Sequence, residues 1–495
     1  MKITGRKFKL SKFAFEFNVE DGYTAIYHAI SMEVVYVKKG VYEKIKQNVG
    51  SMVCDKIKSI KHVICMLIQK NIIILFEEDE SCIVSDIAES LRTAKTTTLR
   101  LQLTDVCNLD CSYCQIEKNY KQNKLLHMSG DIALRGLKLL GKFSPKNVQK
   151  SIILTGGEPT LNYSIIEMLL NRTKGILDSY RFVLFTNGTK ITKRMAKTFK
   201  KYDVLVLISL DGKSRQHDLL RKDPLGNGSF KNALDGFNTC KEYGCKVGIS
   251  GVLGSHNIQE LKTDILDFFV KINPESVGLN FQHYLLNSEN SNILPMEQYT
   301  DAIINAYKEF RIHGIYLENI IRIVEPFVSR KINAKECAAL GQGITILPNG
   351  MVGPCKTLLV AGIMGRPLDE VEKLENLKDN EEFLNWSHRS TYTLESCKGC
   401  VAISLCGSGC TYDSYVIHGN INGIDKRTCV FAKKILEFLI VDLFWIVRNK
   451  SDLDIIIPSE NERHQIYSTI ALDKTDLKRS AGHEIQDSKT ELQKH

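Results

Sequence analysis

The chain of 495 residues is 43% hydrophobic and 25% charged, which is enough for substantial buried cores and favours two to four domains. Its formal charge of +9 is a mild excess. No basic stripe interleaved with aromatic residues accompanies it, so no nucleic-acid partner is expected. Residues 1–12 are basic with no apolar run behind them, so we expect no secretory signal and a cytoplasmic protein.

Residues 1–95 predict a small α+β module. Residues 13–35 have the alternation of short strands, and helical stretches follow near 41–49 and 51–60. Residues 71–76 then form an apolar, strand-like run. This order of elements is compatible with a winged helix.

Residues 96–320 alternate between strand-like and helix-like stretches. Apolar runs rich in β-branched residues occur at 99–103, 151–154, 182–185, 204–209, 246–253 and 277–284. Helical periodicity lies between them at 132–143, 165–180, 230–243 and 258–272. Six βα units in series predict a parallel sheet, either doubly wound or curved into a partial barrel. In both cases the chemistry belongs at the carboxyl ends of the strands.

Residues 321–432 form a third region, rich in cysteine, glycine and turn residues, which would need a metal to stabilise so small an apolar core. Residues 433–495 are predicted to complete an amphipathic helix over 430–447 and then form a polar, mobile tail. Glu437 and Asp442 interrupt the apolar stretch of that helix, so no membrane span is expected.

Fifteen cysteines are the most informative feature of the composition. Ten of them fall into two groups with short gaps, which in a reducing compartment indicates metal ligands rather than disulfides. The other five are expected to be ordinary buried thiols. They are Cys54, Cys65, Cys82, Cys240 and Cys245.

The first group, Cys107, Cys111 and Cys114, follows directly after the first strand of the βα series. Three thiolates on one loop can bind three irons of a cubane cluster and leave the fourth iron without a protein ligand. A structural zinc site would need a fourth cysteine or histidine nearby, and this loop has none.

This loop after a first strand resembles the radical S-adenosylmethionine (radical SAM) superfamily. The resemblance implies a partial (β/α)6 barrel and a 4Fe–4S cluster whose open iron chelates S-adenosylmethionine. Electron transfer from that cluster would release a 5′-deoxyadenosyl radical. Tyr113, just before the third cysteine, would pack near the adenine.

Further cofactor contacts are implied by the resemblance at the ends of the second, third and fourth strands. The motif after the second strand would hold the amino group of the cofactor, and the residues after the third and fourth strands would hold its ribose and carboxylate. The residues concerned are Gly156, Gly157, Glu158 and Pro159, then Asn187, and then Ser209 and Arg221. Along the sixth strand Asn280, Gln282 and Tyr284 form a polar face, as in a substrate cavity or a solvated edge strand.

The second group contains seven cysteines, with a Cys-x2-Cys-x5-Cys-x3-Cys array at its centre. A zinc ribbon needs only four ligands, so seven favour two clusters. The spacing resembles the SPASM domain, which carries two auxiliary 4Fe–4S clusters, making three clusters in all. The resemblance assigns Cys397, Cys400, Cys406 and Cys429 to an outer cluster. Cys337, Cys355 and Cys410 remain for an inner one, with a fourth iron left open or closed by Cys240, Cys245 or another side chain.

The resemblance implies a maturase of ribosomally made peptides, with a precursor peptide as substrate and flavodoxin or ferredoxin as electron donor. The N-terminal module would capture the precursor by strand addition. An open inner iron could bind a substrate thiolate, which makes a thioether cross-link the expected product. A sulfatase maturase is the alternative, but Lys356 stands where those enzymes have an acidic base after the cysteine. A non-catalytic iron–sulfur carrier is a further alternative, although a ferredoxin would not need a cofactor cavity.

Overall fold

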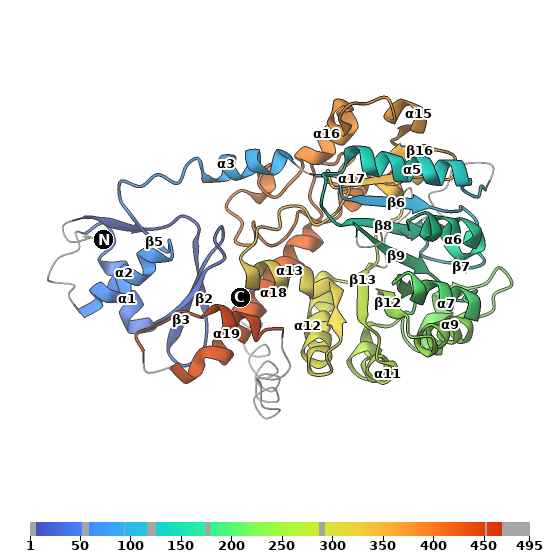
Figure 1. The fold of residues 1–495 in the computed structure, drawn as a ribbon. Helices are drawn as coiled ribbons and strands as arrows, with labels where there is room; N and C mark the ends of the chain where they lie inside the picture. The colour runs from blue at the N-terminus through green and yellow to red at the C-terminus, as the bar shows by residue number, and fades with distance from the viewer. Residues whose placement is uncertain are drawn as a thin grey trace.

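The computed structural model contains an N-terminal sheet, a larger central sheet and a cysteine-rich segment beside it (Figure 1). The ranges described are 6–51, 59–93, 95–115, 125–173, 179–286, 293–450 and 453–467.

The N-terminal unit is built on a four-stranded antiparallel sheet of order β18-β4-β3-β2. Its strands are β2 (Ala14–Asn18), β3 (Tyr23–His28), β4 (Val34–Lys38) and β18 (Ile455–Ile456). A separate antiparallel pair joins β1 (Phe8–Leu10) and β5 (Ile73–Leu75), and the helices are α1 (Lys39–Gln47) and α2 (Lys61–Gln69).

The helix expected at 51–60 falls mostly on residues 52–58, which lie outside the described ranges. The helix α2 follows at Lys61, and Val63, Ile64 and Leu67 form its buried face. After β5, α3 (Ile83–Ser90) leads to the central sheet.

The prediction of a mobile tail after residue 451 is wrong for residues 453–467. Here β18 pairs with β4, and α19 (Glu460–His464) follows after a capping box formed by Ser459 and Glu462. The side chain of Arg463 is fully buried and donates hydrogen bonds to the carbonyl oxygens of Phe327 and Met32. A two-residue strand is too short for periodicity to reveal. Residues 468–495 lie outside the described ranges.

The central sheet has ten strands, and the six predicted parallel strands are adjacent in sequence order. They are β6 (Thr98–Gln102), β8 (Lys150–Thr155), β9 (Tyr180–Thr186), β10 (Leu205–Ile208), β12 (Lys246–Leu253) and β13 (Ser276–Phe281). A doubly wound sheet reverses its strand order at a switch point, whereas these six strands do not. The sequential order is that of a barrel-type α/β fold.

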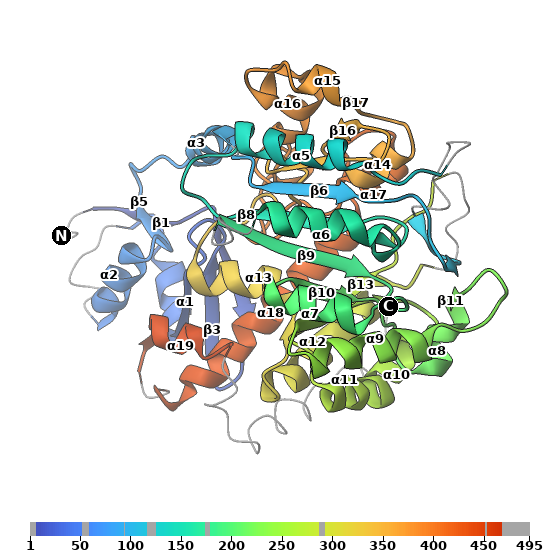
Figure 2. The same ribbon diagram turned by 45° about the vertical axis from the view of Figure 1, so that its right-hand side comes forward.

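Four helices cover one face of the parallel strands, and Figure 2 shows α5 and α6 lying along that face. The helices are α5 (Gly130–Phe143), α6 (Tyr163–Arg172), α7 (Lys193–Lys201) and α9 (Phe230–Glu242). The predicted helix at 165–180 ends early, because its last residue belongs to β9. The predicted helix at 258–272 is interrupted by a π-helical turn over Leu261–Ile265.

The sheet extends beyond the predicted strands at both edges. At one edge β14 (Tyr316–Leu317) pairs with β13. At the other edge β15 (Gly343–Ile346) runs parallel to β6, and β16 (Met351–Gly353) and β17 (Arg366–Pro367) continue antiparallel. The cysteine-rich segment therefore begins as part of the central sheet rather than as a separate layer.

The predicted C-terminal helix forms as α18 (Lys426–Val447), which starts earlier than expected because the Asp425 side chain caps it. It packs on α12 (Met296–Ile312) and α13 (Glu318–Ser329), between the two sheets (Figure 1). Arg311 of α12 and Asp442 of α18 form a buried bidentate ion pair, with N–O distances of 2.7 and 2.8 Å. Within the described chain, no helix combines the length and the apolar character needed to cross a bilayer.

Candidate active site

The first cysteine loop lies at the carboxyl end of β6. Its middle forms β7 (Asp110–Cys111), which pairs antiparallel with β11 (Arg221–Lys222). The Cys114 N–H donates to the Cys111 carbonyl oxygen at 3.0 Å, so the chain turns tightly between these two cysteines. Burial raises the pKa of the Cys107 thiol to about 11 and that of Cys111 to about 12, so metal binding must displace their protons.

Gly156 and Gly157, at the end of the second predicted strand, allow another backbone segment to approach closely. That segment belongs to the protein itself. A Cβ on Gly156 would lie 2.6 Å from the carbonyl oxygen of Thr104, and one on Gly157 would lie 2.4 Å from that of Val106. The Gly157 N–H donates to the Thr104 oxygen at 2.8 Å. These glycines therefore fix the segment that leads into the cysteine loop.

Glu158 is fully buried, and its carboxylate is surrounded by protein donors. It accepts hydrogen bonds from the backbone and hydroxyl of Thr160, from the Thr186 hydroxyl and from the Asn187 backbone. Pro159 starts a short 3-10 turn after it. The structure thus places Glu158 as the residue that positions Asn187, whose side-chain nitrogen lies 4.0 Å from the Cys107 sulfur.

Tyr113, Asp211 and Arg221 form a buried group beside the same loop. The Tyr113 hydroxyl donates to Asp211 Oδ2 at 2.6 Å, and Arg221 donates to the two oxygens of Asp211 at 2.8 and 3.2 Å. The Arg221 guanidinium group, which was expected to contact the cofactor, is therefore directed to the Asp211 carboxylate. Ser209 is half-buried at the end of β10. Sequence reasoning assigned no role to Asp211, whose signal is an acidic residue directly after a buried strand.

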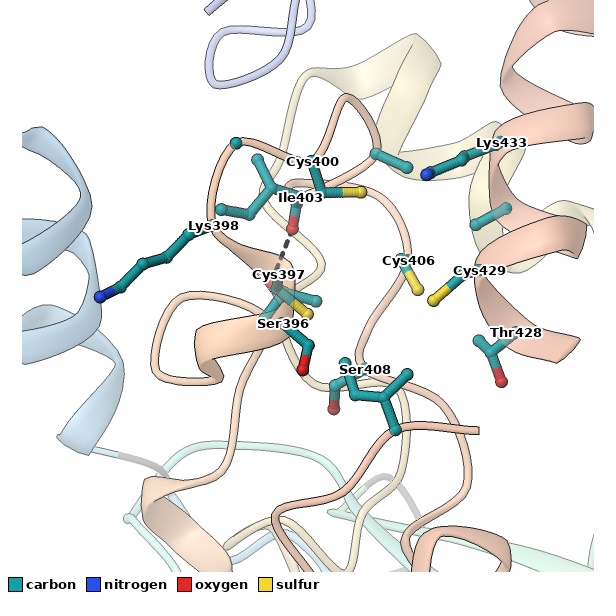
Figure 3. A pocket seen from close by; sticks show the side chains of 15 residues that line it. Ser396, Cys397, Lys398, Cys400, Ile403, Cys406, Ser408, Thr428, Cys429 and Lys433 are labelled. Carbon is teal, nitrogen blue, oxygen red and sulfur yellow. Dashed lines mark hydrogen bonds between the residues drawn. The ribbon is translucent and has the colours of Figure 1, made fainter. Parts of the chain in front are cut away.

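The four cysteines expected to hold an outer cluster converge on one cavity of about 200 Å³. Figure 3 shows the sulfur atoms of Cys397, Cys400, Cys406 and Cys429 turned toward the same space. Cys397 ends a 3-10 turn, and Cys429 lies in the first turn of α18. Among the described residues, no histidine or carboxylate lines this cavity.

The three remaining cysteines pack against one small apolar cluster. Cys337, Cys355 and Cys410 contact this cluster, which includes Leu358 and Trp386. The turn between Cys406 and Cys410 is left-handed, because Gly407, Ser408 and Gly409 all have positive φ, at 70°, 68° and 68°. Cys406 and Cys410 both line a second cavity of about 930 Å³, together with Cys337.

Cys240 and Cys245 do not belong to this group, which contradicts the suggestion that either could close an inner cluster. Both are buried, and the Cys245 thiol donates to the carbonyl oxygen of Ala196 in α7. Cys245 immediately precedes β12 and so lies at its amino end, and neither Cys240 nor Cys245 lines the two cavities that the later cysteines line. Both are the buried thiols expected from their isolation in the sequence.

A buried arginine tests whether these cysteines fit iron–sulfur clusters. Arg389 is 1% exposed, and its Nη2 donates to two carbonyl oxygens and the Ser414 hydroxyl. Its Nε and Nη1 have no hydrogen-bond partner in the described part of the chain. Thiolates at Cys397, Cys410, Cys406 and Cys337 would favour its positive charge. A buried cation needs a counter-charge, and thiolate-ligated clusters would supply it, so the donor set fits.

Lys356 connects the two cysteine regions. It follows Cys355 at the start of α14 (Lys356–Val360), and both Cys114 and Cys355 act on its charge. Burial, and then the Arg100 cation, lower the pKa of Lys356 to about 8.

Comparison with known proteins agrees with this arrangement. Residues 101–268 match the profile of the radical SAM superfamily. The chain therefore contains a radical SAM domain, and the protein is a radical SAM enzyme.

Its relatives include enzymes that act on peptides or proteins. The radical SAM cyclopropyl synthase TigE of Paramaledivibacter caminithermalis is 27% identical over 360 residues, which cover 69% of this chain and 73% of that protein. The cysteine-type anaerobic sulfatase-maturating enzyme of Clostridium novyi is 25% identical, over 61% of this chain and 84% of that enzyme.

Two solved structures share the fold. One is anSMEcpe with bound AdoMet, with a TM-score of 0.57 and 20% identity over 75% of this chain and 99% of that one. The other is Streptococcus suis SuiB, with a TM-score of 0.52 and 14% identity over 85% of this chain and 99% of that one.

Proposed function

We propose that this protein is a maturase that modifies a ribosomally made precursor peptide. The observation that carries the proposal is the convergence of four cysteines on one cavity, in a chain that also contains a radical SAM domain. S-adenosylmethionine on a 4Fe–4S cluster supplies a 5′-deoxyadenosyl radical, which abstracts a hydrogen atom from the substrate. In this proposal Cys107, Cys111 and Cys114 hold that cluster.

The residues around the loop would hold it in place and shield it. The Glu158 carboxylate fixes Asn187 beside Cys107, and Asp211 fixes both Tyr113 and Arg221. In this proposal Gly156, Gly157 and Pro159, which follow β8, and Ser209, which follows β10, lie beside the cofactor at those strand ends.

The seven later cysteines would form a SPASM domain with two auxiliary 4Fe–4S clusters. The four-cysteine cavity supports the outer site, and the packing of Cys337, Cys355 and Cys410 supports the inner one. These clusters would exchange electrons between the substrate and a donor such as flavodoxin or ferredoxin.

The N-terminal unit, which we propose to be winged-helix-like, would capture the precursor. Its strand β2 is at the edge of the antiparallel sheet and pairs only with β3 in the described chain. An extended peptide could add there as a further strand.

The proposed peptide modification has two candidate products, a thioether and a carbon–carbon bond. A thioether follows if an open inner iron binds a substrate thiolate. A carbon–carbon bond is favoured by the similarity to the cyclopropyl synthase TigE. A sulfatase maturase is disfavoured, because the residue after Cys355 is the cation Lys356 rather than a carboxylate.

The first experiment tests the radical site. We expect replacement of Cys107, Cys111 and Cys114 by Ala to abolish formation of 5′-deoxyadenosine by the reduced protein. Iron should fall by about one third, because one of three like clusters is lost. Cys82→Ala is the matched control, since Cys82 is exposed and outside both groups. Formation of 5′-deoxyadenosine by the triple variant would refute the assignment.

A further inference from the structure

Cys337, Cys355 and Cys410 provide three ligands for a cluster of four irons, and a histidine lies beside Cys410. A ring nitrogen of His283, a carboxylate oxygen of Asp413 and the sulfur of Cys410 lie within 4.8 Å of one another. His283 follows the end of β13, and it lines a cavity of about 930 Å³ together with Cys337, Cys406 and Cys410. It therefore faces the same space as two of the three inner cysteines.

The His283 ring is held in one orientation by Asp413. Its Nδ1 lies 2.7 Å from Asp413 Oδ2, and because an ionised carboxylate can only accept, Nδ1 is the donor. The other ring nitrogen, Nε2, then carries the free lone pair. A histidine that donates one N–H to a carboxylate and offers the other nitrogen is the usual arrangement at metal sites.

Both carboxylate oxygens of Asp413 contact neighbouring groups, which fix its side chain. Its side chain is completely buried, and its Oδ1 accepts from the Tyr284 backbone at 3.1 Å. The Arg427 guanidinium lies 3.2 Å from its Oδ2. These contacts make Asp413 the orienting group and leave His283 as the ligand.

We infer that His283 is the fourth protein ligand of the inner cluster, and that Asp413 positions it. The inference rests on the proposed function, because it requires that Cys337, Cys355 and Cys410 hold a 4Fe–4S cluster. A neutral imidazole in place of a thiolate removes one negative charge, so this cluster has a higher reduction potential than an all-thiolate one. A substrate thiolate could bind only by displacing His283. The inner cluster is thus suited to electron transfer, and the carbon–carbon product is favoured over the thioether.

The test uses the full chain with Cys107, Cys111 and Cys114 replaced by Ala, so that only the auxiliary clusters remain. Protein labelled with ¹⁵N-histidine is reduced and examined by pulsed electron paramagnetic resonance, without S-adenosylmethionine or peptide. We expect a strongly coupled ¹⁵N nucleus, which disappears in His283→Ala. His313→Ala is the matched control, because His313 is an exposed histidine bonded to Glu309, and it should keep the coupling.

His283→Cys addresses the case in which His283→Ala loses the cluster. It should restore the iron content without any nitrogen coupling and lower the reduction potential. Nitrogen coupling that survives in His283→Cys would overturn the inference, and so would its absence from a parent protein that carries both auxiliary clusters. About four irons per chain in that parent, instead of about eight, would refute the inner cluster itself and with it the ligand. Loss of peptide modification alone bears only on the proposed function.

Discussion

Arg389 shows at the scale of one residue why the cysteine-rich segment needs its clusters. A buried guanidinium without a carboxylate partner costs several kcal/mol unless a counter-charge is present. Arg389 is such a guanidinium, because its Nε and Nη1 are buried and no described residue accepts a hydrogen bond from them. Thiolate-ligated clusters on both sides would pair with these two groups.

We therefore expect Arg389→Met to weaken the binding of the auxiliary clusters to the protein. Losing a charge-assisted hydrogen bond costs about 1.5–3 kcal/mol, so iron release to a chelator should accelerate roughly ten- to a hundredfold. The measurement is the decay of the iron–sulfur absorbance of the reconstituted protein. Arg311→Met removes an equally buried arginine whose partner is Asp442, and it should leave the release rate unchanged. Equal rates in the two variants would contradict the role given to Arg389.

From the sequence, residues could be assigned to a common site only where they have a fixed spacing along the chain. The four outer cysteines and the first loop were predicted in this way, because short gaps keep ligands close in any fold. Arg221 was expected to contact the cofactor, yet its fork binds Asp211, which no motif marks. His283 lies 130 residues from Asp413 in the chain, so only the folded structure brings the two together.

At the scale of elements, β2 decides whether the N-terminal unit can take up a peptide. Ala29 N–H donates to the Phe13 oxygen at 2.8 Å, and hydrogen-bonded pairs alternate along an antiparallel ladder. The N–H groups of Phe15 and Phe17 therefore face β3, whereas those of Glu16 and Asn18 face the free edge.

We expect Asn18→Pro to lower the affinity for the precursor about three- to tenfold, because one outward N–H is lost at about 0.5–1.5 kcal/mol. Asn18→Ala keeps that N–H and is the matched control. Binding is measured by titration with the labelled peptide, and cleavage of S-adenosylmethionine without peptide should be equal in both variants. Unchanged affinity in Asn18→Pro would remove β2 as the site of capture.

The six parallel strands were predictable because apolar stretches recur along the chain in alternation with helical ones. The strands β1, β15 and β18 were not, because they have only two to four residues and take their stability from partners far away in the chain. Helix ends depended on single caps, as at Asp425, which periodicity does not detect.

At the scale of the whole molecule, the two ends of the described chain meet in one sheet. The predicted boundary at residue 95 therefore divides a unit that also includes residues 453–467. Arg463 joins the parts, because it donates both to Met32 beside the N-terminal sheet and to Phe327 in α13.

We expect Arg463→Leu to lower the free energy of unfolding by about 3 kcal/mol, since two buried carbonyl oxygens lose a charged donor. Arg366→Leu is the control, because Arg366 is exposed and 3.8 Å from Glu370, and it should cost less than about 0.5 kcal/mol. Urea unfolding followed by circular dichroism measures both variants. A loss below 1 kcal/mol for Arg463→Leu would show that the contact adds little.

The pairing of β18 with β4 also sets the order in which the protein can be assembled during its synthesis. Val37 of β4 pairs with Ile455, so the ribosome must add 418 further residues (455 − 37) before this partner exists. At roughly 5–20 residues per second, the edge of β4 stays open for roughly 20–80 seconds. During that interval another extended segment could occupy it, so a newly made chain depends on chaperones, or on the rapid folding of α1 and α2, to keep this edge free.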